Sequence, residues 1–404
     1  MTRDQAGQEF LHTPGPTQIP DKVRQAMSRQ SLDLVDSRLR DLTGSCFADM
    51  KRIFKTDGEV FVYSANGHGA WEAALANLFA PGDVVLLPET GVFSNAWAAQ
   101  AKALGLEARL IPGDWRRAAD PARLEETLRA DSKGEIKGVL LVQTDTATSI
   151  TCDVPAMRRA MDAAGHPALL VVDTVASLAA HPYDMDAWGV NVTIGASQKA
   201  LMGPPGMAIL AVDERALRHA KQSGIARNYW DWHARLGGEF YMRFCGTPPE
   251  QHLFALRAAL DLIFEETLEG VLARHRRLAG AVHRAIEAWS EGGAVSFNAL
   301  EPGERAVSVT TVRLGEGHDP DQLRSFLREE LGVSLAGGLG DLGGKAFRIG
   351  HMGSVNEPMI LGCLATIETA MLQLGIPHES GLRAAAEHIA QTRGKQVLGP
   401  ARAA

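Results

Sequence analysis

The sequence predicts an α/β protein with a mostly parallel sheet, and three observations support this prediction. Short apolar runs typical of buried strands alternate along the chain with amphipathic stretches that have helical spacing. The run at 169–173 is apolar until it ends in Asp173, as a buried parallel strand with a carboxylate at its C-terminal edge would. A second strand, in which Val190, Val192 and Ile194 alternate, is followed closely by Lys199.

The 404 residues are enough for two domains with substantial cores. We expect an N-terminal arm at 1–20, a large domain at 21–265 and a smaller C-terminal domain at 266–390. The remaining residues, 391–404, are rich in Gly, Ala and Arg and are expected to form a disordered tail.

The composition is that of an ordinary globular protein, with 45% hydrophobic and 22% charged residues. A net charge of −7 argues against a nucleic-acid partner. The first ten residues lack the apolar core of a signal peptide, and no apolar run approaches the ~18 residues that a membrane span needs. The four cysteines show no metal-ligand spacing, so we expect a cytoplasmic protein without a metal site or a membrane partner.

Each element has its own signal in the sequence. A turn-rich segment at 13–20 precedes a helix start, apolar runs give the strands, and leucines at helical spacing mark the long helix after residue 250. The predicted strands are 59–64, 83–88, 106–111, 137–143, 169–173, 190–194, 207–212 and 306–313, with a loop and short strand in 336–353. The predicted helices start at residues 21, 65, 91, 121, 250 and 319.

The small-residue turn at 65–69 leads from a strand into a helix. Backbone amides at such a helix start form an anion site, so Asn66, Gly67 and His68 are expected to bind a phosphate. His68 either caps the helix or simply lies at the turn. The same turn supports a rival, a nicotinamide-dependent dehydrogenase, because Gly67 and Gly69 are followed about 20 residues on by an acidic residue. The third glycine of that fingerprint is missing.

Lys199 follows the small residues Gly195–Ser197 and precedes a Gly-Pro-Pro-Gly turn. A lysine placed there can have a desolvated amine with a lowered pKa, which suits condensation with an aldehyde. An arbitrary lysine after a strand would be solvated. Asp173, about 25 residues earlier at another strand end, favours the functional interpretation, because pyridoxal phosphate chemistry requires such a pair.

Two segments carry a resemblance to a known family. Val172–Ser177 and Gly195–Gly206 resemble the class V aminotransferases of fold type I, in the alanine/serine/aspartate–glyoxylate branch. The resemblance implies a large domain with a mostly parallel seven-stranded sheet, a smaller C-terminal α+β domain and pyridoxal 5'-phosphate as cofactor. Lys199 matches the Schiff-base lysine, and Asp173 matches the partner of the ring nitrogen.

The resemblance also assigns residues elsewhere in the chain. Phe93 matches an aromatic residue stacked on the cofactor ring, with an ordinary core position as the alternative. Thr146 matches the donor to the phenolic oxygen, and Val175 and Gln198 belong to the cofactor site as well.

Two further residues match positions at the edges of the family's site. Thr247 matches a threonine that reaches the phosphate of the partner subunit's cofactor, which implies at least a homodimer. It also stands three residues before Glu250, as in a capping box. Arg348 matches the clamp on the substrate α-carboxylate, and its alternation with Phe347 and Ile349 points the guanidinium away from the core.

Five residues depart from the family pattern. Asn66 replaces Ser or Thr, and Phe244 replaces a tyrosine that often contacts the phosphate. Gln143, Asp145 and Ser149 replace His, Glu and Gly, although a turn aspartate such as Asp145 often bonds its own backbone. These departures leave the amino donor and acceptor open.

The predicted activity is a ping-pong transamination from serine, alanine or aspartate to glyoxylate or a similar small 2-oxo acid. A pyridoxamine–pyruvate aminotransferase, similar over residues 348–353, is the main alternative. A cysteine desulfurase is disfavoured because residues 331–350 contain no cysteine, and a non-catalytic sensor would be expected to lose Lys199 or Asp173.

Overall fold

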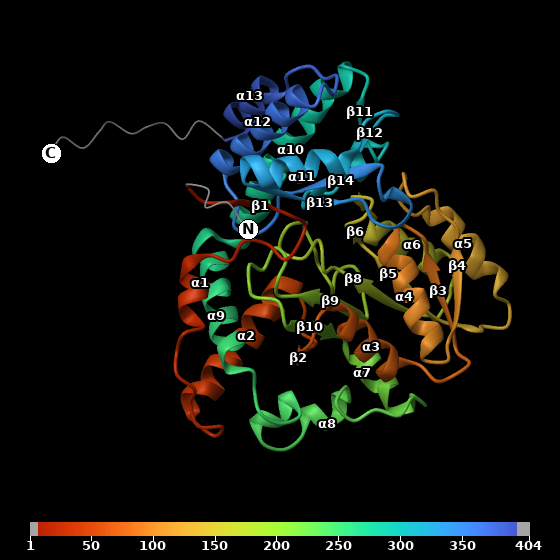
Figure 1. Ribbon diagram of the computed structural model, residues 1–404. Coiled ribbons are helices and arrows are strands. Elements are labelled where there is room, and N and C mark those ends of the chain that lie inside the picture. Colours follow the sequence, from red (N-terminus) through yellow and green to blue (C-terminus); the bar gives the residue numbers. More distant parts are fainter. Residues whose placement is uncertain (1–6, 394–404) are drawn as a thin grey trace.

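The computed structural model describes residues 7–393, which form two lobes (Figure 1). The larger lobe is built on a seven-stranded sheet in which only β10 runs antiparallel to its neighbours. The strands in spatial order are β2 (Glu59–Ser64), β10 (Met207–Val212), β9 (Val192–Ala196), β8 (Leu169–Asp173), β5 (Ile136–Val142), β3 (Val84–Pro88) and β4 (Glu107–Ile111). The α/β class and the seven-stranded, mostly parallel sheet are confirmed.

Helices cover both faces of this sheet because its strands are apolar on both sides. In β2, Val60 and Val62 belong to one core, whereas Phe61 and Tyr63 belong to the other. The first core is covered by α2 (Ser37–Phe54), α5 (Pro121–Ala130), α6 (Val154–Ala163) and α9 (Glu250–Glu266). The second is covered by α3 (Gly67–Leu78), α4 (Val92–Ala103), α7 (Glu214–His219) and α8 (Trp232–Leu236).

The smaller lobe is an α+β unit with its own apolar core. Its five-stranded sheet has the order β1 (Phe10–His12), β13 (Val333–Gly337), β14 (Ala346–Gly350), β12 (Val309–Leu314) and β11 (Val295–Phe297). Its helices are α10 (Leu268–Glu291), α11 (Pro320–Leu331), α12 (Glu357–Gln373) and α13 (Leu382–Thr392). None of the helices within residues 7–393 is long and apolar enough to cross a membrane.

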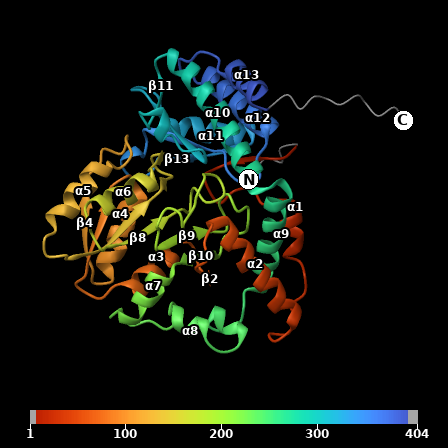
Figure 2. The ribbon, with the colours of Figure 1, turned by 180° about the vertical axis from the view of Figure 1, so that it is seen from behind.

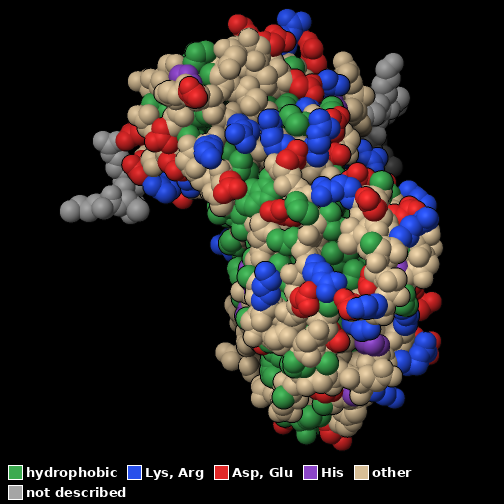
Figure 3. Space-filling view, turned by 90° about the vertical axis from the view of Figure 1, so that its right-hand side faces the viewer, with side chains coloured by type: hydrophobic (Ala, Val, Ile, Leu, Met, Phe, Trp, Pro, Cys, Tyr) green, Lys and Arg blue, Asp and Glu red, His purple; other side chains and the backbone are tan. Residues whose placement is uncertain are grey.

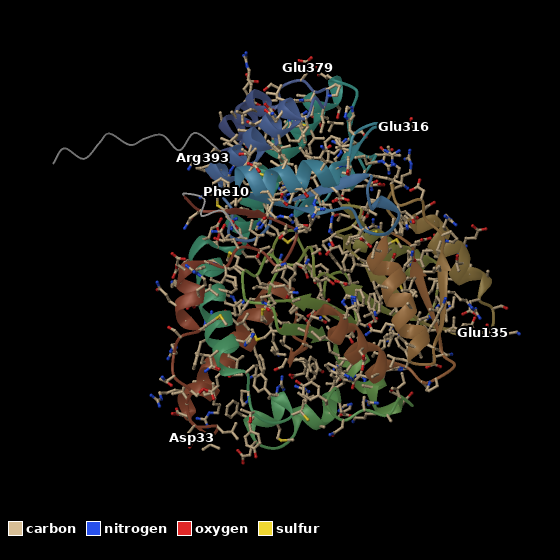
Figure 4. All side chains as sticks on the ribbon, viewed as in Figure 1. Phe10, Asp33, Glu135, Glu316, Glu379 and Arg393 are labelled. Carbon is tan, nitrogen blue, oxygen red and sulfur yellow. The ribbon has the colours of Figure 1, made fainter. Side chains whose placement is uncertain are left out.

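The N-terminal segment joins the two lobes. Phe10, labelled in Figure 4, pairs with Val333, so β1 adds a parallel strand to the small-lobe sheet. The chain then crosses the boundary between the lobes before α1 (Asp21–Ala26), which packs against α9 of the large lobe (Figure 2). The waist between the lobes is seen from the side in Figure 3, where hydrophobic side chains gather along it.

Each predicted strand and helix overlaps an element of the structure, but many bounds differ by one to three residues, and the helices α2, α6, α10 and α12 were not predicted. The strands at 59–64, 169–173 and 207–212 have the predicted bounds, and the helices predicted to start at residues 21, 121 and 250 do so. The capping box at Thr247 is wrong, because α9 begins after Pro249 and the carboxylate of Glu250 instead accepts the amide of Leu32 at 2.7 Å. Helix α13 extends to Thr392, and the rest of the predicted tail, residues 394–404, lies outside the described residues.

The crossing segment leaves no room for a side chain at Gly350. A Cβ there would meet the carbonyl group of Thr13 and would lie 2.8 Å from the nitrogen of Pro14. We therefore expect Gly350→Ala to lower the free energy of unfolding by about 1–3 kcal/mol, measured in urea, because the backbone must shift. Gly237→Ala is the control, because a Cβ at Gly237 meets nothing within 4 Å. Equal stability of the two variants would contradict this packing.

Candidate active site

A cavity opens where neighbouring strands of the large sheet end. Val142 of β5 pairs with Asp173 of β8, which pairs with Ile194 of β9, so the residues that follow these strands meet at one edge. The first turn of α3 closes the same space. The cavity has a volume of about 160 Å³ and is lined by Asn66, Gly67, His68, Trp71, Phe93, Val142, Thr144, Thr146, Asp173, Val175, Ala176, Gln198 and Lys199.

The structure brings most of the predicted site residues to this cavity. All of the predicted cofactor residues line it except Thr247, and Arg348 lies outside its lining too. Sequence reasoning missed Trp71, Val142, Thr144 and Ala176. Trp71 carried a usable signal, because it stands four residues after Gly67 on the helix that opens there, and side chains four apart share a helix face.

Lys199 is held at the cavity by the crossing N-terminal segment. Its Nζ donates a hydrogen bond of 2.6 Å to the carbonyl oxygen of Pro14. Burial lowers the pKa of Lys199 to about 8, and the positive charge of Arg348 lowers it further, while Asp173 opposes the shift. A lysine with this pKa supplies neutral amine near neutral pH, which is what attack on a carbonyl carbon needs.

Gly15 is required beside this lysine. Its φ of +118° lies in the region that favours glycine, and an added Cβ would lie 2.6 Å from Nζ of Lys199. The backbone of the N-terminal segment therefore packs directly on the lysine side chain. The amine has a fixed position between the cavity and the Pro14 carbonyl.

Asp173 is a buried carboxylate with two donors. Its Oδ2 accepts the indole N–H of Trp71 at 2.8 Å, and its Oδ1 accepts the amide of Val175 at 2.6 Å. Burial raises the pKa of Asp173 to about 6, with the two N–H donors and Lys199 opposing this and Asp145 adding to it. The carboxylate is thus ionised at neutral pH, and it faces a cavity in which a cationic partner would be favoured.

The start of α3 provides unpaired backbone donors. The Oδ1 of Asn66 accepts the amide of Gly69 at 3.2 Å, so Asn66 is the N-cap and His68 is not. The amides of Gly67 and His68 precede the first intrahelical bond, and no hydrogen bond from either is seen within residues 7–393. Two free amides at a helix N-terminus favour an anion at this end of the cavity.

Arg348 is buried between the lobes rather than pointing into solvent, with 7% of its surface exposed. Arg348 lies on β14. Its Nε donates a hydrogen bond of 2.7 Å to the carbonyl oxygen of Gly337, and its Nη1 donates one of 3.0 Å to the carbonyl oxygen of Thr146. Burial lowers the pKa of Arg348 to about 10, and the negative charge of Asp145 opposes this shift. Among the described residues no carboxylate lies within 4 Å of the guanidinium. The buried positive charge of Arg348 therefore favours the binding of an anion from outside the chain.

The turn 145–149 connects this arginine to the cavity. Asp145 bonds its own turn, as a turn aspartate often does, since Oδ1 accepts the amide of Ala147 at 2.9 Å, and Oδ2 accepts that of Phe93 at 2.8 Å. Ser149, where the family has Gly, adopts a φ of +60°, and its hydroxyl bonds that of Thr311 on β12 at 2.6 Å. The turn is therefore fastened to both lobes.

Thr247 lies apart from these groups. It is exposed on the large lobe and does not line the cavity, while the neighbouring Phe244 is buried. Its predicted role was to act in the site of a partner subunit, and nothing in the single chain tests that role. It stays a prediction.

Both the sequence and the fold of this chain are similar to those of known proteins. The model of the family described as aminotransferase class-V matches residues 9–341. A serine–glyoxylate aminotransferase of Methylorubrum extorquens is 39% identical over 95% of this chain and 96% of its own length. An L-aspartate–glyoxylate aminotransferase of Paracoccus denitrificans is 36% identical over 95% of this chain and 97% of its own.

The fold is also similar to that of an aminotransferase. The crystal structure of a pyridoxamine–pyruvate aminotransferase from Mesorhizobium loti superposes with a TM-score of 0.87 at 25% identity. The superposition covers 97% of this chain and all of that one. This chain therefore shares its fold, over nearly its whole length, with a pyridoxamine–pyruvate aminotransferase.

The environment of Lys199 predicts a pH dependence that can be measured. A lysine amine reacts with aldehydes only when neutral, so its reactivity rises as pH increases through its pKa. We expect cofactor-free protein, treated with formaldehyde and cyanoborohydride, to methylate Lys199 with a midpoint near pH 8, quantified by peptide mass spectrometry. A midpoint near the ordinary lysine value of 10.5 would show that the amine is not desolvated.

Proposed function

This chain belongs to the class V aminotransferase family, and we propose that it is a pyridoxal 5'-phosphate enzyme that moves an amino group from a small amino acid to glyoxylate or a similar 2-oxo acid. The single observation that carries the proposal is the pairing of a desolvated Lys199 amine with a buried Asp173 carboxylate on one cavity. The names of the relatives support glyoxylate as acceptor and serine or aspartate as donor.

The cavity offers a matching group for each part of this cofactor. The amine of Lys199 suits the aldehyde, Asp173 suits the ring nitrogen, and the amides of Gly67 and His68 suit the phosphate. Phe93 and His68 supply aromatic surface on the cavity wall. When bound, the cofactor supplies an electron sink that stabilises negative charge at the substrate α-carbon.

Lys199 is the residue that moves the proton. With its amine neutral, Nζ accepts the proton from the α-carbon of the donor, and the buried position keeps bulk water away from the exchange. The carbonyl of Pro14, 2.6 Å away, accepts one N–H of the lysine and so orients the nitrogen lone pair. Asp173 remains ionised, and its negative charge would favour the protonated form of the cofactor's ring nitrogen.

Arg348 orients the substrates by their carboxylates. Its Nε and one Nη1 hydrogen are bonded to main-chain carbonyls, which fix the plane of the guanidinium. Nη2 has no hydrogen bond to the described residues and is left to donate to an incoming carboxylate. Both donor and acceptor carry an α-carboxylate, so one arginine serves both halves of a ping-pong reaction.

A homodimer is part of the proposal. Thr247 is exposed, far in the chain from the helix that opens the cavity, and would act only if a second copy brought it to the phosphate end. The cytoplasmic location predicted from the sequence stays a prediction.

The second candidate is a pyridoxamine–pyruvate aminotransferase. It is favoured by the structural similarity to that enzyme. It is also favoured by Asn66, which stands where the family has Ser or Thr and whose side-chain oxygen caps α3. The two candidates differ in a simple assay. The purified protein is incubated with each amino acid and glyoxylate in one series, and with free pyridoxamine and pyruvate in another. Product in the first series supports our proposal, and product only in the second supports the alternative.

The role of Lys199 is tested by Lys199→Ala. Purified wild-type protein loaded with pyridoxal phosphate is expected to show a visible band near ~420 nm, and the variant should lose both the band and turnover. Lys345→Ala, which changes an exposed lysine in the small lobe, should keep both. Retention of the band and of full activity in Lys199→Ala would refute the assignment.

The role of Arg348 is tested by Arg348→Gln. Because hydrogen bonds to a charged group contribute about 1.5–3 kcal/mol, the KM for the oxo acid should rise roughly 10- to 100-fold. Arg313→Gln, on the adjacent strand β12, is the matched control and should leave KM unchanged. A KM for Arg348→Gln equal to that of the wild type would contradict the clamp, provided that both melting temperatures agree.

A further inference from the structure

Trp71 reaches from α3 to the carboxylate at the end of β8. Its Nε1 lies 2.8 Å from Oδ2 of Asp173, a contact across 102 residues of chain. The side chain is 1% exposed and forms part of the cavity wall. The indole has no role in the binding of the phosphate or of the substrate carboxylate proposed above. Its N–H donates to Asp173.

Neighbouring rings fix the plane of this indole. Trp97 of α4 stacks on it with centroids 5.4 Å apart and planes 14° apart. His68 lies on the cavity side at 4.5 Å, and Phe93 approaches edge-on at 6.4 Å. An indole packed in this way cannot swing its N–H away from Asp173 without breaking the stack. The hydrogen bond is therefore a rigid one.

The same helix serves both ends of the cavity. Gly67 and His68 in the first turn of α3 offer amides to an anion, and Trp71 one turn later reaches the carboxylate at the other end. The distance between the two ends is thus set by one helix of fixed geometry. Sliding or fraying of α3 would disturb both together.

The groups around Asp173 have opposing effects on its ionisation, and the hydrogen bond from Trp71 favours the ionised form. The carboxylate is buried, which favours its neutral form, and the negative Asp145 on β6 adds to this. Lys199 opposes them from the end of β9, and His68 of α3 faces the indole. The N–H donors of Trp71 and Val175 favour the ionised form, so each offsets part of the burial cost.

We infer that Trp71 is a positioning residue, whose indole N–H holds the Asp173 carboxylate ionised and aimed at the base that binds in the cavity. This inference rests on the proposed function, because the base is the ring nitrogen of the cofactor. Oδ1 and Oδ2 each keep one lone pair beyond their N–H donors, so the carboxylate can still accept from a protonated ring.

Trp97 makes a matched control. It is buried like Trp71 and stacked on it, but its Nε1 has no hydrogen-bond partner among the described residues. Replacing either indole by phenylalanine removes similar apolar volume. Only Trp71→Phe removes a hydrogen bond to Asp173, so a difference between the two variants reports on that bond and not on packing.

The test compares wild type, Trp71→Phe and Trp97→Phe as holoenzymes. Loss of the donor raises the pKa of Asp173, so the ionised form is lost at a higher pH as the solution is acidified. In Trp71→Phe we expect the acid limb of kcat/KM to move up by about one pH unit, which is a tenfold loss on that limb. Because a rise in the Asp173 pKa from about 6 to roughly 7 cuts the ionised fraction at pH 6.5 about threefold, the dissociation constant of pyridoxal phosphate should rise about threefold at that pH and recover at pH 8.5. Trp97→Phe keeps an aromatic ring to stack on Trp71 and leaves the Trp71–Asp173 hydrogen bond in place, so it should change neither quantity.

Every outcome decides the matter. An unmoved acid limb and unchanged cofactor affinity in Trp71→Phe would overturn the inference, as would equal shifts in both variants. If Trp71→Phe does not fold, the benzothiophene analogue of tryptophan at position 71, which has the same shape but no N–H, replaces it and carries the same expectation. If the wild type itself binds no pyridoxal phosphate, the proposed function fails, and this is distinguishable because the wild-type arm alone reports it.

Discussion

The structure depends on the burial of two opposite ionisable groups at one edge of a parallel sheet. Burial lowers the pKa of Lys199 to about 8 and raises that of Asp173 to about 6, so the same desolvation brings an amine and a carboxylate toward neutral pH. Solvated, the amine would be protonated and unreactive. The parallel register that aligns the ends of β5, β8 and β9 is what makes the shared burial possible.

The two lobes are coupled through short main-chain segments. The N-terminal crossing gives the Pro14 carbonyl to Lys199, and the turn 145–149 gives the Thr146 carbonyl to Arg348. A change in the angle between the lobes would therefore move the amine and the guanidinium at once. The Ser149 side chain adds a hydroxyl bond to Thr311, which a glycine at this position could not make.

Local signals in the sequence predicted much of the fold and the cavity. Apolar strands ending in Asp173 and Lys199 predicted a site at the strand ends, and small residues at 65–69 predicted the helix start. Contacts between segments distant in the chain were out of reach. No local pattern shows that the Trp71 indole meets Asp173, that Pro14 accepts from Lys199, or that a strand arginine such as Arg348 is buried by a second lobe. The capping box predicted at Thr247 does not form because α9 begins only after Pro249 and the carboxylate of Glu250 accepts the remote amide of Leu32.

We propose that the amine of Lys199 forms the covalent link to the cofactor inside this cavity. The most direct measurement is reduction of the cofactor-loaded protein with borohydride, followed by digestion and peptide mass spectrometry. We expect a phosphopyridoxyl adduct on the peptide that contains Lys199 and on no other lysine. An adduct on a different lysine, or an unmodified Lys199 in protein that had bound the cofactor, would contradict it.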